Sequence, residues 1–279
     1  MSWLFRVLDI ETIPDESVWM PGPRTYKLAP AETLYGIQLQ VAGIEAVEPF
    51  PPPQAHRVVA VSYVDVVFDP TTEPRYRFDK CYTECRWAAD PMGADLEEAK
   101  LLRTFAAAME SPDQPQIHLV TWNGRTFDLP VISMRSLRHK IPCRWYYAEK
   151  NVRYRYSPEG HCDLMDELSD YGASRQMKLG DFCRVIGLPG KTDMSGDKVL
   201  DQYQLAVKSP ADEAEAIRAR VARYCLQDTV QTALAFLRTR YHFGKIGAAS
   251  HDASLATFQD SPSVCDALAI DWTKLVLSC

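Results

Sequence analysis

Hydrophobic and polar positions follow two different patterns along the chain. Apolar and alternating runs, which are typical of β-strands, predict strands over residues 5–11, 58–68, 75–82 and 117–122. A three-and-four spacing, which is typical of amphipathic helices, predicts helices over residues 96–109, 179–186 and 211–241, and another after Pro130. This order of elements predicts an α/β fold in which helices flank a mixed central β-sheet.

A proline-rich segment separates the first two predicted strands. It covers residues 14–56 and includes the run Pro49–Pro53. A structureless loop of that length is seldom part of a core, so we expect a surface insertion. We predict one domain over residues 1–242, which contains this insertion, and a C-terminal extension over residues 243–279 whose role the sequence does not indicate.

Composition narrows the class of protein. Of 279 residues, 46% are apolar, which is enough for one substantial core. No apolar run approaches the roughly 18 residues of a membrane span, and the N-terminus runs into an acidic strand, unlike a signal peptide. We therefore expect a soluble, cytoplasmic protein. The eight cysteines include no Cys-X-X-Cys pair, which favours reduced thiols over disulfides or structural zinc.

Charge is distributed unevenly. The net charge of −6 argues against broad, charge-driven binding of duplex nucleic acid. Residues 135–156, however, contain seven Arg or Lys and one Glu, a net charge of +6, so the rest of the chain carries −12. Five Trp or Tyr residues interleave with these cations. Such mixtures bind single strands, and a hairpin with one solvated face is an equally good interpretation.

Two acids occur on the first predicted strand, in Val-Leu-Asp9-Ile-Glu11-Thr. Side chains two residues apart on a strand point to one face, so Asp9 and Glu11 should converge while Leu8 and Ile10 face the opposite layer. Neighbouring buried carboxylates need protonation, cations or metal ions. A hard divalent cation is the natural partner, whereas a solvated edge strand is the simpler alternative for an isolated Asp-X-Glu.

A third acid, Asp128, follows the strand 117–122 and an Asn-Gly turn, and Pro130 comes just after it. Proline is tolerated in a first helical turn, so Asp128 should lie at a helix N-terminus, where a carboxylate is favourable. It can act there as a helix cap, as a ligand, or as both.

The long predicted helix carries Tyr224 and Asp228 one turn apart, on the same face as Ile217 and Val221. An acid on an apolar stripe is costly unless it has a partner. A hydrogen bond within the core is the alternative to a metal or a substrate.

The chain resembles the DEDD 3′-5′ exonucleases, which have a ribonuclease-H-like fold and three sequence motifs. The residues similar to these motifs are, in order, Asp9 with Glu11, Asp128 within Asn123-Gly-Arg-Thr-Phe-Asp, and Tyr224 with Asp228. The tyrosine branch places Tyr four residues before the last acid, as here. The histidine branch places His five before it, where this chain has Arg223.

Two further segments are similar to stand-alone proteins related to the proofreading exonuclease domain of family B DNA polymerases. They are His161-Cys-Asp-Leu-Met-Asp166 and Gly187-Leu-Pro-Gly-Lys191. The resemblance spans about residues 4–241.

The resemblance implies two Mg²⁺ or Mn²⁺ ions held by Asp9, Glu11, Asp128 and Asp228, with Tyr224 orienting or deprotonating the attacking water. Such a site releases nucleoside 5′-monophosphates from 3′ ends of single-stranded nucleic acid, with DNA favoured. Since the phenol pKa is near 10, orientation is the better interpretation. The candidate substrate-binding residues are Thr12, Asn123, Phe127, Arg153, Arg155 and Lys191.

Two other functions fit the sequence. One is a catalytically silent nucleic-acid-binding module, which the complete set of acids disfavours. The other is an exoribonuclease or nucleotide hydrolase of the same fold, because recognition of the 2′ position depends on pocket shape. The chain contains no polymerase region, so proofreading or DNA repair would require a separate polymerase or repair protein as a partner.

Overall fold

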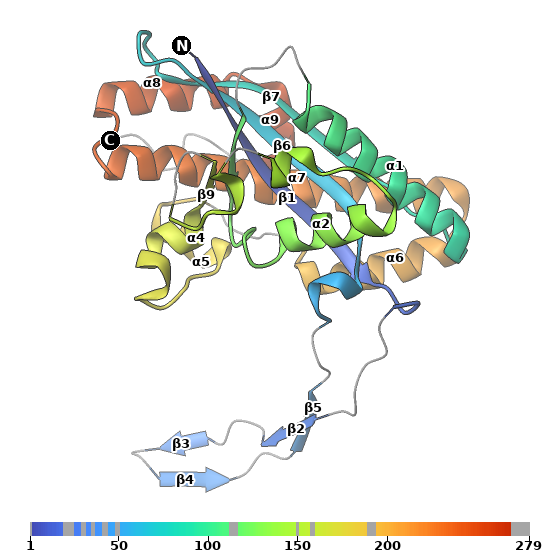
Figure 1. The fold of residues 1–279 in the computed structure, drawn as a ribbon. Coiled ribbons are helices and arrows are strands. Elements are labelled where there is room, and N and C mark those ends of the chain that lie inside the picture. The colour runs from blue at the N-terminus through green and yellow to red at the C-terminus, as the bar shows by residue number, and fades with distance from the viewer. Residues whose placement is uncertain are drawn as a thin grey trace.

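The computed structural model describes residues 2–18, 51–111, 117–148, 151–156, 160–188 and 194–268, together with four short strands between residues 25 and 47. Its centre is a five-stranded sheet in the order β7-β6-β1-β8-β9 (Figure 1). The strands are β1 (Trp3–Pro14), β6 (His56–Phe68), β7 (Tyr76–Cys85), β8 (Ile117–Thr121) and β9 (His161–Asp163).

Strand directions confirm the predicted fold class. β6 is antiparallel to β1 and β7, whereas β8 is parallel to β1 and β9 is parallel to β8. A mixed sheet with this order, in which only the second of its strands along the chain is reversed, is the ribonuclease-H-like sheet. β1 lies at its centre and is covered on both faces, so most of its apolar residues beyond Trp3 and Phe5 are buried; Val7 is 0% and Leu8 is 1% exposed.

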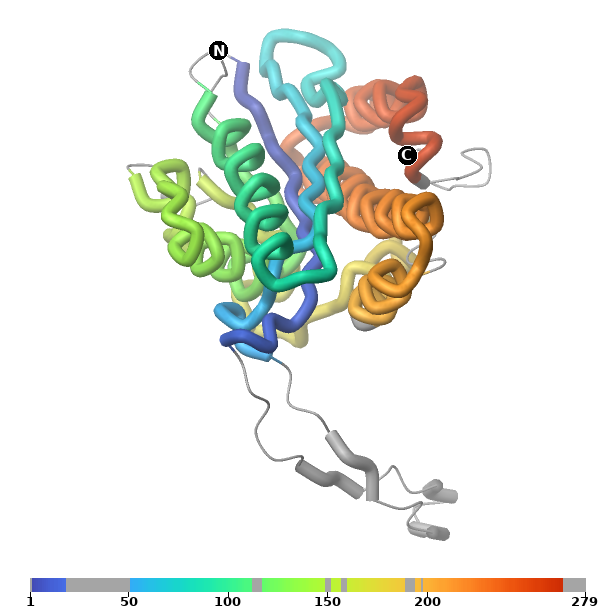
Figure 2. Tube along the Cα trace, turned by 90° about the vertical axis from the view of Figure 1, so that its right-hand side faces the viewer, coloured from blue at the N-terminus to red at the C-terminus, as the bar shows by residue number. Residues whose placement is uncertain are grey.

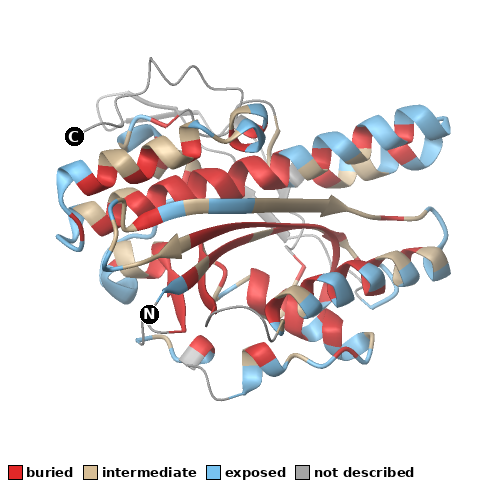
Figure 3. Cartoon of the chain, turned by 90° about the horizontal axis from the view of Figure 1, so that it is seen from above, coloured by how far each residue is buried: buried red, intermediate tan, exposed pale blue. Residues whose placement is uncertain are grey.

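Helices form one layer on each face of the sheet (Figures 2 and 3). On one face, α1 (Pro91–Met109) and α2 (Asp128–Arg138) pack on β6. On the other face, α7 (Ala211–His242) crosses β6, β1 and β7, and α6 (Val199–Lys208) lies beside it. Each layer has its own apolar core, and Leu8 and Ile10 belong to the core under α1 and α2, as predicted.

The remaining helices are short. The α-helices are α3 (Arg144–Tyr147), α4 (Leu164–Leu168), α5 (Leu179–Val185), α8 (Ala248–Gln259) and α9 (Pro262–Leu268), and the 3-10 turns are η1 (Pro53–Ala55), η2 (Asn151–Arg153), η3 (Asp170–Gly172) and η4 (Gly196–Lys198). No helix in the described part of the chain has a segment long and apolar enough to cross a membrane. The seven described cysteines are free thiols.

Most predicted elements coincide with observed ones, but several observed elements were not predicted, among them β9, α4, α6, α8 and α9. β9 has only three residues, too few for an alternating pattern, and α6 follows directly after a loop rich in small polar residues. The helix predicted after Pro130 is α2, which begins two residues earlier, at Asp128, and ends at Arg138. The predicted insertion separates β1 from β6 and contains β2 (Thr25–Leu28), β3 (Glu32–Leu34), β4 (Ile37–Gln40) and β5 (Ile44–Val47), which pair as β2-β5 and β3-β4.

The described part of the predicted C-terminal extension packs on the sheet. α8 contacts β7, and α9 contacts α7. Leu255, Phe258 and Val264 are buried in the same apolar core as β1 and α7. Residues 243–268 therefore share the core of the domain.

Candidate active site

The acids of β1 face α7. One carboxylate oxygen each from Asp9 and Glu11 and the Sγ atom of Cys225, on α7, all lie within 4.8 Å of one another. Glu11 is 7% exposed, and Asp9 is half-buried. The two-residue periodicity of the strand thus brings both carboxylates to one face, as predicted.

Asp128 approaches the same point from α2. It is the first residue of that helix, and its Oδ1 accepts a hydrogen bond of 3.2 Å from the backbone N–H of Ile10, which lies between Asp9 and Glu11. Burial, with the negative charge of Asp163 adding to it, raises the pKa of Asp128 to about 7. A carboxylate this deeply buried is stabilised in its charged form by a nearby cation.

Tyr224 and Asp228 complete the group from α7. Both are 5% exposed, and Tyr224 is hydrogen-bonded to Asp228. Burial, followed by the charges of Asp228, Glu11 and Asp9, raises the pKa of the Tyr224 phenol. Burial and the same three carboxylates also raise the pKa of the Cys225 thiol. The field at this point is therefore strongly negative, and the donors are mainly carboxylate oxygens, which suits a hard divalent cation.

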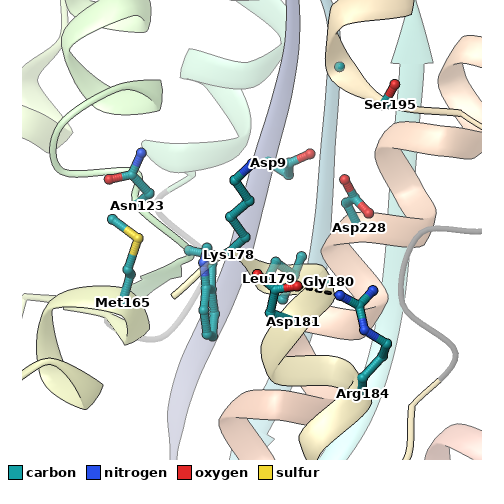
Figure 4. Close-up of a pocket in the computed structure, with 12 residues that line it drawn as sticks. Asp9, Asn123, Met165, Lys178, Leu179, Gly180, Asp181, Arg184, Ser195 and Asp228 are labelled. Carbon is teal, nitrogen blue, oxygen red and sulfur yellow. Dashed lines mark hydrogen bonds and ion pairs between the residues drawn. The ribbon is translucent and has the colours of Figure 1, made fainter. Parts of the chain in front are cut away.

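A cavity of about 480 Å³ opens beside these acids. Asp9 and Asp228 line it together with Trp122, Asn123, Met165, Lys178, Leu179, Gly180, Asp181, Arg184, Ser195 and Gly196 (Figure 4). A Cβ added to Gly196 would lie 3.9 Å from Glu11 Oε2, so this loop reaches the other β1 acid as well. The volume is within the usual range for small-ligand sites.

Residues 48–264 match the model of a family described as a predicted 3′-5′ exonuclease related to the exonuclease domain of PolB. The chain belongs to this exonuclease family. The match includes Asp128, Tyr224 and Asp228, and it begins after Asp9 and Glu11. The predicted membership of a 3′-5′ exonuclease family is therefore confirmed.

Solved structures similar to this family member include two larger proteins. The family B DNA polymerase of Pyrobaculum calidifontis is 14% identical with a TM-score of 0.46, and the alignment covers 97% of this chain and 27% of the polymerase. Escherichia coli exonuclease I in complex with a dT13 oligonucleotide is 13% identical with a TM-score of 0.33, and the alignment covers 62% and 30%. The aligned part is less than a third of either solved chain. A search of curated proteins finds no match to this chain.

The turn before Asp128 depends on two residues with special backbone requirements, Asn123 and Gly124. Asn123 has φ 66°, a left-handed conformation that asparagine adopts more readily than most residues. A Cβ on Gly124 would lie 2.5 Å from the Thr121 side chain, so only glycine fits there. The Asn-Gly pair therefore allows the chain to turn sharply from β8 into α2, with Asn123 at the cavity.

Asp163 holds this turn from β9. Its Oδ1 accepts from the Asn123 N–H at 2.9 Å, and its Oδ2 accepts from the Arg125 N–H at 2.9 Å. Asp166 accepts two hydrogen bonds from Arg155 and lies 3.3 Å from Arg125 Nε. The sequence indicates no role for the two acids of the segment His161–Asp166. In the structure, Asp163 holds the turn before α2 and Asp166 holds Arg155.

The other candidate substrate-binding residues make different kinds of contact in the structure. Thr12 Oγ1 hydrogen-bonds His56 Nδ1 at 2.9 Å, and the Phe127 ring packs edge-on to His56 at 4.9 Å. The Arg153 guanidinium lies 4.9 Å from the centre of the Tyr147 ring, and Arg155 is paired with Asp166. Lys191 lies outside the described residues.

Several cavity residues were missed by sequence reasoning. Trp122 directly follows β8, Met165 lies on α4, and Lys178 precedes α5. None of them belongs to a spacing pattern that points to chemistry. Only the packing of three separate segments around Asp9 brings them together.

Proposed function

We propose that this protein removes nucleoside 5′-monophosphates from the 3′ ends of single-stranded nucleic acid, with DNA favoured, as a member of the tyrosine branch of the DEDD exonucleases. The observation that carries the proposal is the meeting of Asp9, Glu11, Asp128 and Asp228, from β1, α2 and α7, beside an open cavity. Family membership supports degradation from the 3′ end, and the four acids support metal-dependent hydrolysis of the phosphodiester bond.

The tyrosine branch is supported by α7. Tyr224 is hydrogen-bonded to Asp228 and lies within the field of all three nearby acids. Arg223, which occupies the histidine position of the other branch, donates to the Asp266 carbonyl oxygen on α9. Its side chain is therefore engaged away from the acids.

The four carboxylates would hold two Mg²⁺ or Mn²⁺ ions. When bound, such ions lower the pKa of water and stabilise the attacking and leaving oxygens of an in-line displacement. The Tyr224 phenol stays protonated at neutral pH, because its pKa is raised. We therefore assign it the role of orienting the attacking water by hydrogen bonding.

The cavity would receive the 3′-terminal nucleotide. Trp122, Met165 and Leu179 offer apolar surface to a base, and Lys178 offers a cation to a phosphate. Asn123, at the tight turn, would contact the sugar or the phosphate of the same nucleotide.

Oligonucleotides labelled at the 5′ or the 3′ end test the proposal. With Mg²⁺ or Mn²⁺, 5′-labelled single-stranded DNA should shorten as a ladder, and 3′-labelled DNA should release labelled mononucleotide at once. Chelation by EDTA should stop both reactions. Faster cleavage of the RNA counterpart would identify an exoribonuclease. Binding without cleavage at any metal concentration would identify a silent binding module and refute the proposal.

A further inference from the structure

Three tyrosines gather on the surface beside the candidate site. Tyr154 is 59%, Tyr156 is 60% and Tyr171 is 37% exposed. The rings of Tyr154 and Tyr156 lie 6.1 Å apart edge to face, and those of Tyr156 and Tyr171 lie 5.1 Å apart. Exposed, contiguous aromatic surface of this kind marks an interaction site more often than chance exposure. We refer to these three residues as the tyrosine platform.

The platform is assembled by a buried acid and a strained turn. Arg155 donates to both oxygens of Asp166, at 3.1 and 2.8 Å, and to the Tyr171 carbonyl oxygen at 3.0 Å. This guanidinium therefore ties the segment of Tyr154 and Tyr156 to η3. Asp170 and Tyr171 have φ 48° and 56°, a left-handed conformation that is costly for residues with a Cβ. Such strain persists where the surrounding contacts hold it, and it is concentrated at functional sites.

Contacts through α4 and through the turn before α2 connect the platform to the cavity. On α4, Met165 lines the cavity and the next residue, Asp166, holds Arg155. Arg125 follows Asn123 by two residues, and its guanidinium donates to the carbonyl oxygens of Val152 and Arg153 at 3.5 and 3.3 Å. Asn123 and Met165 flank the cavity on the side away from Asp228 in Figure 4.

We propose that the tyrosine platform stacks on the bases of the single strand upstream of its 3′-terminal nucleotide. The inference rests on the proposed function and names the path by which the substrate reaches the site. An unpaired base can offer its face to a tyrosine ring, whereas a paired and stacked base in a duplex cannot. Arg153 lies next to Tyr154 with its side chain over Tyr147 and can meet the backbone phosphates. Arg155 acts as a positioning residue, since its charge is engaged by Asp166.

The test compares substrates of different length. Tyr156→Ala should raise the KM for a 12-nucleotide single strand about tenfold, the effect of losing one stacked base, with kcat within about twofold. Hydrolysis of the nitrophenyl ester of thymidine monophosphate, which ends at the metals, should be unchanged. Tyr156→Phe should keep the wild-type KM because the ring is retained. Met92→Ala, on α1 and 74% exposed, is the matched surface control and should change neither substrate.

Photo-crosslinking locates the strand directly. 5-Iodouracil placed a few nucleotides from the 3′ end should crosslink to Tyr156 or Tyr171 in the wild-type protein, and peptide mass spectrometry would identify the residue. Crosslinks found only elsewhere, or a Tyr156→Ala variant with an unchanged KM at every length, would overturn the inference while leaving the exonuclease proposal standing. Absence of all metal-dependent cleavage would instead refute the proposed function, and crosslinking would still report whether the platform binds a strand.

Discussion

At the scale of single residues, the roles proposed for the phenol of Tyr224 and for the carboxylates around it can be tested separately. Burial and three nearby negative charges raise the pKa of Tyr224, so its hydroxyl donates a hydrogen bond at neutral pH. Asp9 and Asp228 line the cavity that is proposed to receive the 3′-terminal nucleotide. Removing the hydroxyl and removing a carboxylate should therefore have different consequences.

Changing Tyr224 to Phe keeps the packing of the ring and deletes only the hydroxyl. We expect kcat to fall by roughly 10²–10⁴-fold, the usual effect of a positioned acid-base group, with Mn²⁺ affinity retained in calorimetry. Tyr203→Phe is the matched control, because that hydroxyl donates to the Ala88 carbonyl oxygen at 3.1 Å, away from the acids. A wild-type rate for Tyr224→Phe would assign the tyrosine to core packing alone.

Changing Asp9 or Asp228 to Ala should abolish metal-dependent trimming of single-stranded DNA. Either change removes one of the proposed metal ligands and also relieves repulsion between neighbouring carboxylates, so the midpoint of thermal unfolding without metal should not fall. Asp79→Ala, at an exposed position of β7, should retain full activity. Unchanged trimming in either site variant would contradict the assignment of the site.

At the scale of secondary-structure elements, the site depends on how β9 supports the turn between β8 and α2. Asp163 is 4% exposed and accepts from the N–H groups of Asn123, Arg125 and Met165. One side chain thus orders the residue that lines the cavity, the residue that supports the tyrosine platform, and the first turn of α4.

Replacing Asp163 by Ala leaves these amides without their acceptor. Each buried, unsatisfied group costs about 1–3 kcal/mol, so we expect the free energy of unfolding in urea to fall by about 2–4 kcal/mol and kcat to fall with it. Asp163→Asn retains an acceptor oxygen and should recover part of both quantities. A variant with normal stability and normal activity would show that the turn holds its shape without Asp163.

At the scale of the whole molecule, one edge of the sheet is covered by α8. β7 is at one edge of the sheet, and the Phe78 N–H donates to Thr257 Oγ1 on α8 at 2.9 Å. The rings of Phe78 and Phe258 lie 5.4 Å apart. Covering an edge in this way also prevents it from pairing with another chain.

A chain ending at Lys245 should therefore fail to fold stably. It would lose Leu255, Phe258 and Val264 from the core, and each such side chain contributes about 1.5–3 kcal/mol through burial. Together with Ile246 and Ala267 this is of the order of 6 kcal/mol or more, comparable to the total stability of about 5–15 kcal/mol typical of a domain. Expression in the insoluble fraction, or a thermal midpoint lowered by more than about 10 °C, is expected. An undiminished midpoint would make residues 246–279 a separate extension.

Local sequence patterns were sufficient to predict which acidic side chains share a face of a strand or helix and where α2 begins. The period of two predicted that Asp9 and Glu11 share a face, and the helical period predicted the same for Tyr224 and Asp228. The Asn-Gly turn with Pro130 predicted that Asp128 begins a helix. These inferences hold because side-chain direction within one strand or helix is set by backbone geometry, independently of what packs against it.

Only the tertiary structure decided the partners of the remaining residues. The sequence made Arg155 a candidate for binding the substrate, but in the structure it pairs with Asp166 and holds the tyrosine platform. Tyr171 joins Tyr156 from 15 positions further along the chain, and Lys178 and Trp122 meet at one cavity from separate segments. β9, with three residues, exists because β8 offers it a pairing edge. Contacts between distant segments carry no periodicity in the sequence, because they depend on how whole elements pack.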